Sequence, residues 1–232
     1  MMNNMKYLMP LTLLLFGLIA CGDNSGEKAE ISDAGDAAEA TEMASVYSVN
    51  TDNSVINWEG YKPTGTHNGT VQIQKGTFTV NEGGIESGSF VMDMTSIEVL
   101  DLEGDKKNDL TQHLLGTAEG REDDFFNTTE YPTALFELVS TEALPNDSTA
   151  THRISGNLTI KGETAQLSFK ANVSMDDDSF TASSNLFKVD RTRWGINFMS
   201  KSVVDDVKDG IIYDEIGLSI KLVAEKEAEK DM

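Results

Sequence analysis

The residues best suited to acid–base or metal chemistry are three histidines in separate segments, His67, His113 and His152. None belongs to an H-E-x-x-H motif, and the only cysteine, Cys21, is far from all of them in the chain. The chain has no G-x-S-x-G nucleophile elbow and no glycine-rich phosphate loop. We therefore expect no catalysis, no metal site and no cofactor. A hydrolase that uses His113 with nearby acids is the enzymatic alternative.

Two acidic runs could bind cations or transfer protons, but their spacing fits neither role. Asp101 to Asp105 begins like a calcium loop, yet Lys106 and Gln112 stand where that loop needs Gly and Glu. We interpret this run as a solvated turn. The pair Asp123-Asp124 comes directly before two phenylalanines, a position more typical of helix or turn caps than of catalysts.

Cys21 has a different chemistry, indicated by what precedes it. Lys6 supplies a positive charge, and Leu8 to Ile19 form a mostly apolar stretch. This is the plan of a signal peptide, and the stretch is too short for a membrane-spanning helix, which needs about 20 residues. It ends in Leu-Ile-Ala before Cys21, as in a bacterial lipobox. We expect residues 1–20 to be removed and Cys21 to be acylated, which anchors the protein in the cell envelope, at the periplasmic or outer-membrane face.

Charge restricts the possible partners. The net charge is −21, and loss of Lys6 with the signal makes it −22. Nucleic acid is not an expected partner, because affinity for phosphate backbones comes from clustered Lys and Arg.

A disulfide framework is impossible with one cysteine, so a packed core must supply the stability.

Residues 22–45 hold seven acids, one Lys and a single Ile. Such a composition favours a flexible tether, which would hold the following domain about 25 to 30 Å from the membrane. A helix over AGDAAEATEMA is the alternative, and it would also be a spacer. The folded domain is expected over residues 46–224, and residues 225–232 should form a charged tail.

Within that domain, alternation of apolar and polar residues predicts strands. The pattern is strongest over residues 163–175, where Leu167, Phe169, Ala171 and Val173 share one face. Turn sequences such as Pro63-Thr-Gly65 and Lys161-Gly162 separate the segments. About eight strands at this spacing suggest an antiparallel sandwich or barrel. The other strands are marked by Ile56 and Trp58, Val71 and Ile73, Phe90 and Met92, Phe136 and Leu138, Ile154 to Ile160, Phe180, Ala182 and Leu186, and Ile216 to Leu222.

One stretch departs from the β pattern. Leu110 and Leu114 stand at helical spacing, and Gly116 is a plausible helix stop. We expect residues 98–132 to be a helix-containing connection outside the sheet. A connection of this length usually has a function, and we expect Leu114, Phe125 and Phe126 to pack against one end of the barrel as a lid or a plug.

Six segments in order resemble the YceI-like family of secreted lipid-binding proteins. They are YSVNTDNSVINWEGYK, GTHNGTVQIQKGTFTV, GSFVMDMTSIEV, HLLGTAEGREDDFFNTTEYPTALFEL, GNLTIKGETAQLSF and VDRTRWGINF. The resemblance implies an extended, lipocalin-like antiparallel β-barrel whose lumen holds a polyisoprenoid or a similar long-chain lipid. The sequence departs from the family pattern by inserting Gly116 to Arg121 before the FF-x4-YP motif, next to the expected barrel mouth.

An eight-stranded barrel is just wide enough to be filled by side chains or to hold one small ligand. Small residues on the inner face, Gly88, Gly156, Ala171 and Ala182, would leave space for a lipid. A filled barrel with a structural or protein-binding role is the alternative. The residues expected to contact the lipid are Trp58, Ile73, Phe78, Phe90, Met92, Phe136, Leu167, Phe169, Ala171, Phe187 and Phe198, together with the lid residues.

A polar head group would be selected at the barrel mouth. The candidates are His67, Arg191 and Arg193. For a diphosphate the arginines matter most, because guanidinium groups can offset the negative field locally. An ion pair with Asp190 or another acid is the alternative role of Arg191, and a hydrogen bond that fixes its own turn is the alternative for His67.

The first prediction concerns the anchor. Cys21→Ser should release the protein from membrane fractions or leave the signal uncleaved, because the residue that accepts the lipid is lost. Fractionation and N-terminal mass measurement check this. Normal processing and membrane attachment of the variant would exclude the lipobox.

Overall fold

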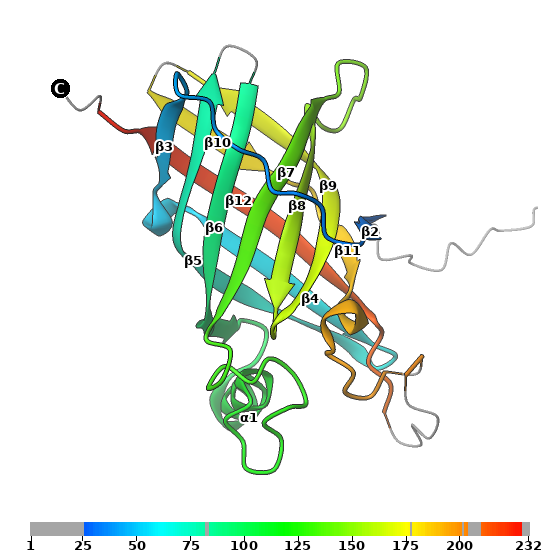
Figure 1. The fold of residues 1–232 in the computed structure, drawn as a ribbon. Coiled ribbons are helices and arrows are strands. Elements are labelled where there is room, and N and C mark those ends of the chain that lie inside the picture. Colours follow the sequence, from blue (N-terminus) through cyan, green and yellow to red (C-terminus); the bar gives the residue numbers. More distant parts are fainter. Residues whose placement is uncertain (1–25, 82–83, 177, 201, 204–209, 229–232) are drawn as a thin grey trace, which may run out of the picture.

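Eight antiparallel strands close into a ring in the computed structural model, which describes residues 26–81, 84–176, 178–200, 202–203 and 210–228 (Figure 1). The ring closes because β12 pairs with β4 on one edge and with β10 on the other. The predicted antiparallel barrel is thus confirmed. The ring strands are β4 (Val55–Lys62), β5 (Gly65–Asn81), β6 (Gly84–Val99), β7 (Thr133–Ala143), β8 (His152–Ile160), β9 (Glu163–Met175), β10 (Ser179–Ser183) and β12 (Glu215–Lys226).

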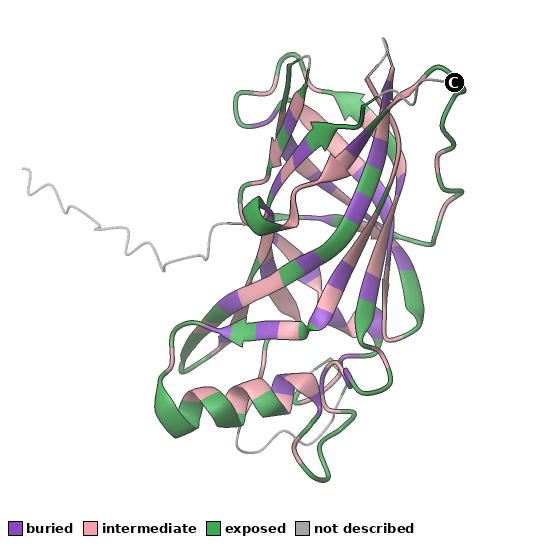
Figure 2. Ribbon diagram, turned by 90° about the vertical axis from the view of Figure 1, so that its left-hand side faces the viewer, coloured by how far each residue is buried: buried purple, intermediate pink, exposed green. Residues whose placement is uncertain are grey.

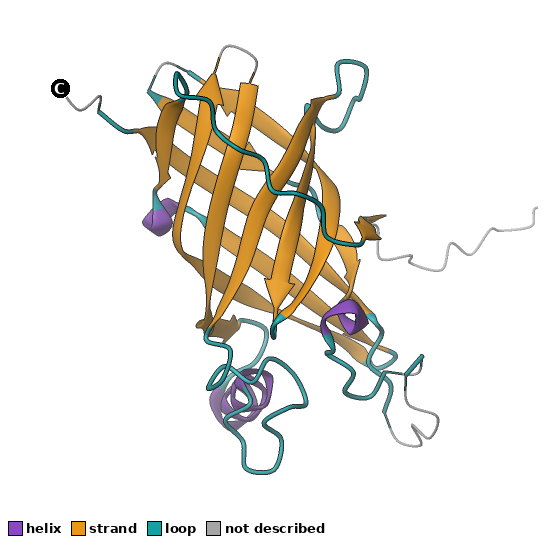
Figure 3. Cartoon of the chain, viewed as in Figure 1, coloured by secondary structure: helices purple, strands orange, loops and turns teal. Residues whose placement is uncertain are grey.

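Short elements flank the ring (Figure 3). The strand β3 (Ser45–Val49) pairs with β5 and β12, and β11 (Phe187–Asp190) pairs with β12. Two 3-10 helices, η1 (Thr51–Asn53) and η2 (Arg191–Trp194), precede β4 and follow β11. Leu186, grouped in the sequence with Phe180 and Ala182, lies instead in the link between β10 and β11, so its assignment to a strand was wrong.

Buried and exposed residues alternate along the strands, as the bands in Figure 2 show. In β9 the residues Ala165, Leu167, Phe169 and Ala171 are buried, and their neighbours are more exposed. Successive side chains of a strand point to opposite faces, so these residues face the barrel interior. The alternation predicted from the sequence is confirmed here.

The one α-helix among the described residues, α1 (Gly104–Leu115), lies beyond one end of the barrel (Figure 1). It ends as predicted at Gly116, which adopts a left-handed conformation with φ of 72°. A β-carbon there would lie 2.4 Å from the carbonyl oxygen of Glu122, so the close approach of the returning chain also requires glycine. Because β6 continues to Val99, the connection starts at Leu100 rather than at residue 98.

Residues 26–41, here called the strap, run along the outside of the barrel wall (Figure 1). The strap strand β1 (Glu27–Lys28) pairs in parallel with β11, and β2 (Glu30–Ser32) pairs antiparallel with β9. Gly35 accepts from the Asn157 amide at 2.7 Å and donates its N–H to the same side chain at 3.0 Å. The prediction of a free coil is therefore wrong for the strap.

The strap is ordered in spite of its acidic composition, because main-chain pairing with a sheet does not need apolar side chains. Edge strands present unpaired N–H and C=O groups, and the acidic strap satisfies some of them. It also covers outward polar residues, so that Ser155 and Asn157 are only 8% and 6% exposed. At the other terminus, Glu225 and Lys226 belong to β12, so the charged tail begins later than predicted.

Among the described residues, no helix is long and apolar enough to cross a membrane. The predicted signal peptide, residues 1–20, and Cys21 lie outside those residues.

The second prediction concerns the strap. Asn157→Ala should lower the free energy of unfolding by about 1 to 2 kcal/mol, because two hydrogen bonds to Gly35 are lost. Amide exchange should accelerate over residues 33–38 and stay unchanged in β5 and β6. Asn172→Ala, which removes one exposed bond to the Thr149 carbonyl, is the matched control. Equal acceleration of strap exchange in both variants would contradict the prediction.

Candidate functional site

The barrel interior contains an apolar cavity of about 150 Å³ at the end away from α1. Its wall is built from the inward residues of the ring strands and β11. Nine of the residues expected to contact a lipid line it: Ile73, Phe78, Phe90, Met92, Phe136, Leu167, Phe169, Ala171 and Phe187.

A second apolar cavity, of about 160 Å³, lies at the end nearer α1. Trp58 and Met92 line it from the barrel, and the predicted lid residues Leu114, Phe125 and Phe126 line it from the connection. The connection therefore packs against this end of the barrel. Phe198 lines neither apolar cavity and instead packs beside the lid, with its ring centre 4.8 Å from that of His113.

The two cavities adjoin one another inside the barrel. Four side chains line both of them: Ile56, Met92, Leu158 and Leu218. Met92 is the most adaptable of the four, because methionine has three rotatable bonds and no branch.

The small inward residues have two different roles. Ala171 and Ala182 line the first cavity, as predicted. Gly156 does not leave space for a ligand, because a β-carbon there would lie 2.2 Å from Cζ of Phe136, whose ring fills the space. Gly88 is crowded in the same way by Phe78, at 3.0 Å. The interior is therefore partly filled by its own aromatic rings.

The lid is held by a polar contact at its centre. His113 Nε2 lies 2.7 Å from Asp124 Oδ2, and the His113 ring meets Phe125 edge-on with centres 4.9 Å apart. Asp123 accepts from the Asn127 amide at 2.9 Å. Trp58 Nε1 is buried and has no hydrogen-bond partner among the described residues.

A family comparison decides the relationship of this chain to known proteins. Residues 47–224 match the model of the YceI-like domain. The chain belongs to the YceI-like family.

Solved structures share the fold of this YceI-like domain. BcnA from Burkholderia cenocepacia superposes with a TM-score of 0.54 at 19% identity, over 75% of this chain and 98% of BcnA. A polyisoprenoid binding domain from Saccharophagus degradans, implicated in plant cell wall breakdown, gives 0.53 at 13% identity, over 78% of this chain and 98% of that domain. At these identities the likeness establishes the fold. A search of curated proteins gives no match.

Arg191 of the YceI-like domain is a structural residue. It is 2% exposed and donates four hydrogen bonds to the carbonyl oxygens of Ile196, Phe198, Ile212 and Tyr213, at 2.6 to 3.1 Å. Asp214 lies 3.9 Å away, so the acid partner foreseen as the alternative is present. Burial lowers the pKa of the guanidinium, and the nearby carboxylates oppose that shift. These contacts leave the guanidinium little capacity for a head group.

The other two head-group candidates lie away from both apolar cavities. His67 lies between Lys62 and Asp101, with its ring nitrogens 3.0 and 2.8 Å from their polar atoms. This fits the alternative role of fixing its turn. Arg193 is half-exposed and lies 3.5 Å from Asp33 of the strap. The described residues contain no group of three or more potential ligands placed to hold a metal ion.

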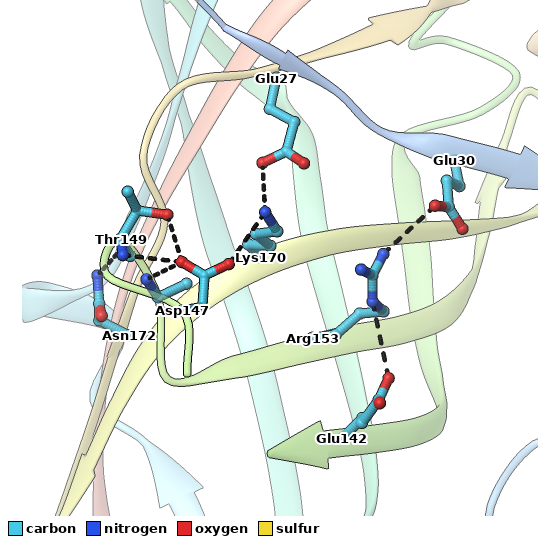
Figure 4. Close-up of polar contacts among 9 residues, drawn as sticks. Glu27, Glu30, Glu142, Asp147, Thr149, Arg153, Lys170 and Asn172 are labelled. Carbon is cyan, nitrogen blue, oxygen red and sulfur yellow. Dashed lines mark hydrogen bonds and ion pairs between the residues drawn. The ribbon is translucent and has the colours of Figure 1, made fainter. Parts of the chain in front are cut away.

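A polar cleft of about 450 Å³ under the strap was not predicted from the sequence (Figure 4). Lys170 lies 3.0 Å from Glu27 and 3.1 Å from Asp147, and Arg153 lies 3.4 Å from Glu30. The hydrogen bond from Lys170 to Glu27, followed by that to Asp147, raises the lysine pKa. The sequence alternation places Lys170 on the outer face, but nothing in it indicates that a segment more than a hundred residues away covers that face.

The third prediction concerns Arg191. Arg191→Met should destabilise the fold by about 3 kcal/mol, because four backbone carbonyls lose their donor and Asp214 loses its ion-pair partner. Chemical denaturation measures this. Arg193→Met, at an exposed site, is the matched control and should change stability by less than about 1 kcal/mol. A normally stable Arg191 variant that no longer binds an anionic lipid would restore the head-group role.

Proposed function

We propose that this YceI-like protein binds one long apolar chain in the barrel interior and carries or sequesters a polyisoprenoid or similar amphiphile, without catalysis. The observation that carries the proposal is the pair of apolar cavities in line inside a closed ring. The polyisoprenoid binding domain of the same fold supports the class of ligand.

The volumes of the two cavities decide whether such a ligand fits. A cavity of about 150 Å³ holds a ring the size of benzene, so neither cavity alone fits a long chain. Occupation of both by one chain requires the side chains that line both cavities, Met92 among them, to move. Burial of 15 to 20 methylenes would then contribute roughly 12 to 16 kcal/mol before the cost of association. Binding by buried area selects chains by length and girth.

The filled barrel remains the alternative function, and one observation favours it. Phe136 occupies the space beside Gly156, so part of the lumen is already packed. Native mass spectrometry of protein purified without detergent separates the two functions. A co-purifying lipid supports the carrier, and an unliganded mass after incubation with lipid supports the filled barrel.

We further propose that the protein is acylated at Cys21 and acts at an envelope membrane. Five residues after Cys21 the described chain begins at Gly26, and five extended residues span at most about 17 Å. An acylated Cys21 would therefore hold the strap close to the membrane surface. This distance is shorter than the 25 to 30 Å expected for a tether that is free up to residue 45.

The fourth prediction tests the lumen. Ala171→Trp should place an indole in the first cavity, change the melting temperature by only a few degrees and weaken binding of a fluorescent long-chain probe at least tenfold. Ala165→Trp is the matched control, because Ala165 is inward and fully buried but lines neither apolar cavity. That change should overpack the core and cost about 1 to 3 kcal/mol or more. Marked destabilisation by both variants, with a wild type that never binds the probe, would defeat the carrier function.

A further inference from the structure

The barrel wall has a seam that ring strands close over only part of its length. β10 pairs with β9 at Asn172 to Met175, and β11 pairs with β12 but with no residue of β9 in the described chain. Over the remaining part the strap fills the gap, because β2 pairs with β9 and β1 with β11. The wall is thus completed there by a segment outside the ring.

The polar cleft under the strap adjoins the lumen at this seam. Phe169 of β9 and Phe187 of β11 line both the cleft and the first apolar cavity. Their rings stack across the seam with centres 4.6 Å apart and planes 9° apart. Two side chains therefore separate a charged exterior from an apolar interior.

Two cations face the cleft from neighbouring strands. Arg153 of β8 and Lys170 of β9 are direct cross-strand partners, an arrangement that is unfavourable for like charges unless anions lie between or beside them. The barrel supplies two such anions, Asp147 to Lys170 and Glu142 to Arg153, the latter at 3.7 Å. The strap supplies the other two, Glu27 and Glu30 (Figure 4).

The strap carboxylates are the replaceable ones. Asp147 is fixed by the hydroxyl and N–H of Thr149, by Lys170 and by the N–H of Ala150, and the Thr149 bonds chiefly lower its pKa. Glu27 and Glu30 have side chains 63% and 77% exposed, and exposed ion pairs contribute little to stability.

We propose that Lys170 and Arg153 bind the phosphate or diphosphate head group of a long-chain ligand, which takes the place of the Glu27 and Glu30 carboxylates while its chain enters the lumen between Phe169 and Phe187. This inference rests on the proposed function and names the head group that the site selects. The local charge supports it: a phosphate or diphosphate group brings about two or more negative charges to the place of two carboxylates, so both cations keep anionic partners in a strongly acidic protein. The strap is then a cover that the ligand displaces.

The test uses the full chain carrying Cys21→Ser, purified without detergent, and three probes: geranylgeraniol, geranylgeranyl diphosphate and inorganic diphosphate. The variants are Lys170→Gln with Arg153→Gln, and Glu27→Gln with Glu30→Gln. Lys75→Gln, which removes an exposed lysine of β5 on another part of the wall, is the matched control. Melting temperatures establish that each variant is folded.

The wild type should bind the organic diphosphate more tightly than the alcohol. Loss of both cations should weaken diphosphate binding at least tenfold and leave alcohol binding unchanged. Loss of both glutamates should strengthen diphosphate binding several-fold, and this variant keeps the test valid if the cation variant does not fold. Amides of residues 27–32 should exchange faster with the diphosphate bound than with the alcohol bound.

Three outcomes would overturn the inference. They are an equal effect of the cation variant on both long-chain probes, inorganic diphosphate binding as tightly as the long-chain diphosphate, and a strap that stays equally protected with either ligand. If the alcohol binds while the diphosphate gains nothing from the cations, only this head-group site fails. If neither long-chain probe binds the wild type, the proposed function itself fails.

Discussion

The ring closes where β12 hydrogen-bonds to β4 on one edge and to β10 on the other, and the interior, the lid and the strap all depend on that closure. A closed antiparallel ring has no free edges and one continuous inner face. In this barrel β12 is paired with strands on both of its edges, but the pairing between β9 and β10 is short. The strap and the stacked Phe169 and Phe187 supply what the ring strands leave open.

Closure also determines how much space the interior has. Large inward side chains would fill an eight-stranded ring, so any room depends on where small residues stand. The space beside Gly156 is filled by the ring of Phe136, whereas Ala171 borders a cavity. Two positions that look equivalent in the sequence thus have opposite effects, and the lumen is neither empty nor fully packed.

The features of the fold that depend on residues close together in the chain can be predicted from the sequence. The alternation through Leu167 and Phe169 and the helix stop at Gly116 were predicted and are present. The partners of Arg191 could not be predicted, because they are backbone carbonyls of residues between η2 and β12, and a carbonyl carries no side-chain motif that a sequence could reveal. The same holds for the strap, whose pairing uses main-chain groups that composition does not reveal.

The pairing of the two ends of the ring has a consequence for the order of folding. Ser54 exchanges hydrogen bonds with Val223, 169 residues further along the chain. Contacts of such long range make folding slow, because a large loop must close before they form. The barrel cannot assemble until the last strand is available, and the strap, although synthesised before every barrel strand, has no complete surface to dock on until then. Until then the strap lacks the main-chain partners on β9 and β11 that hold it in the finished protein.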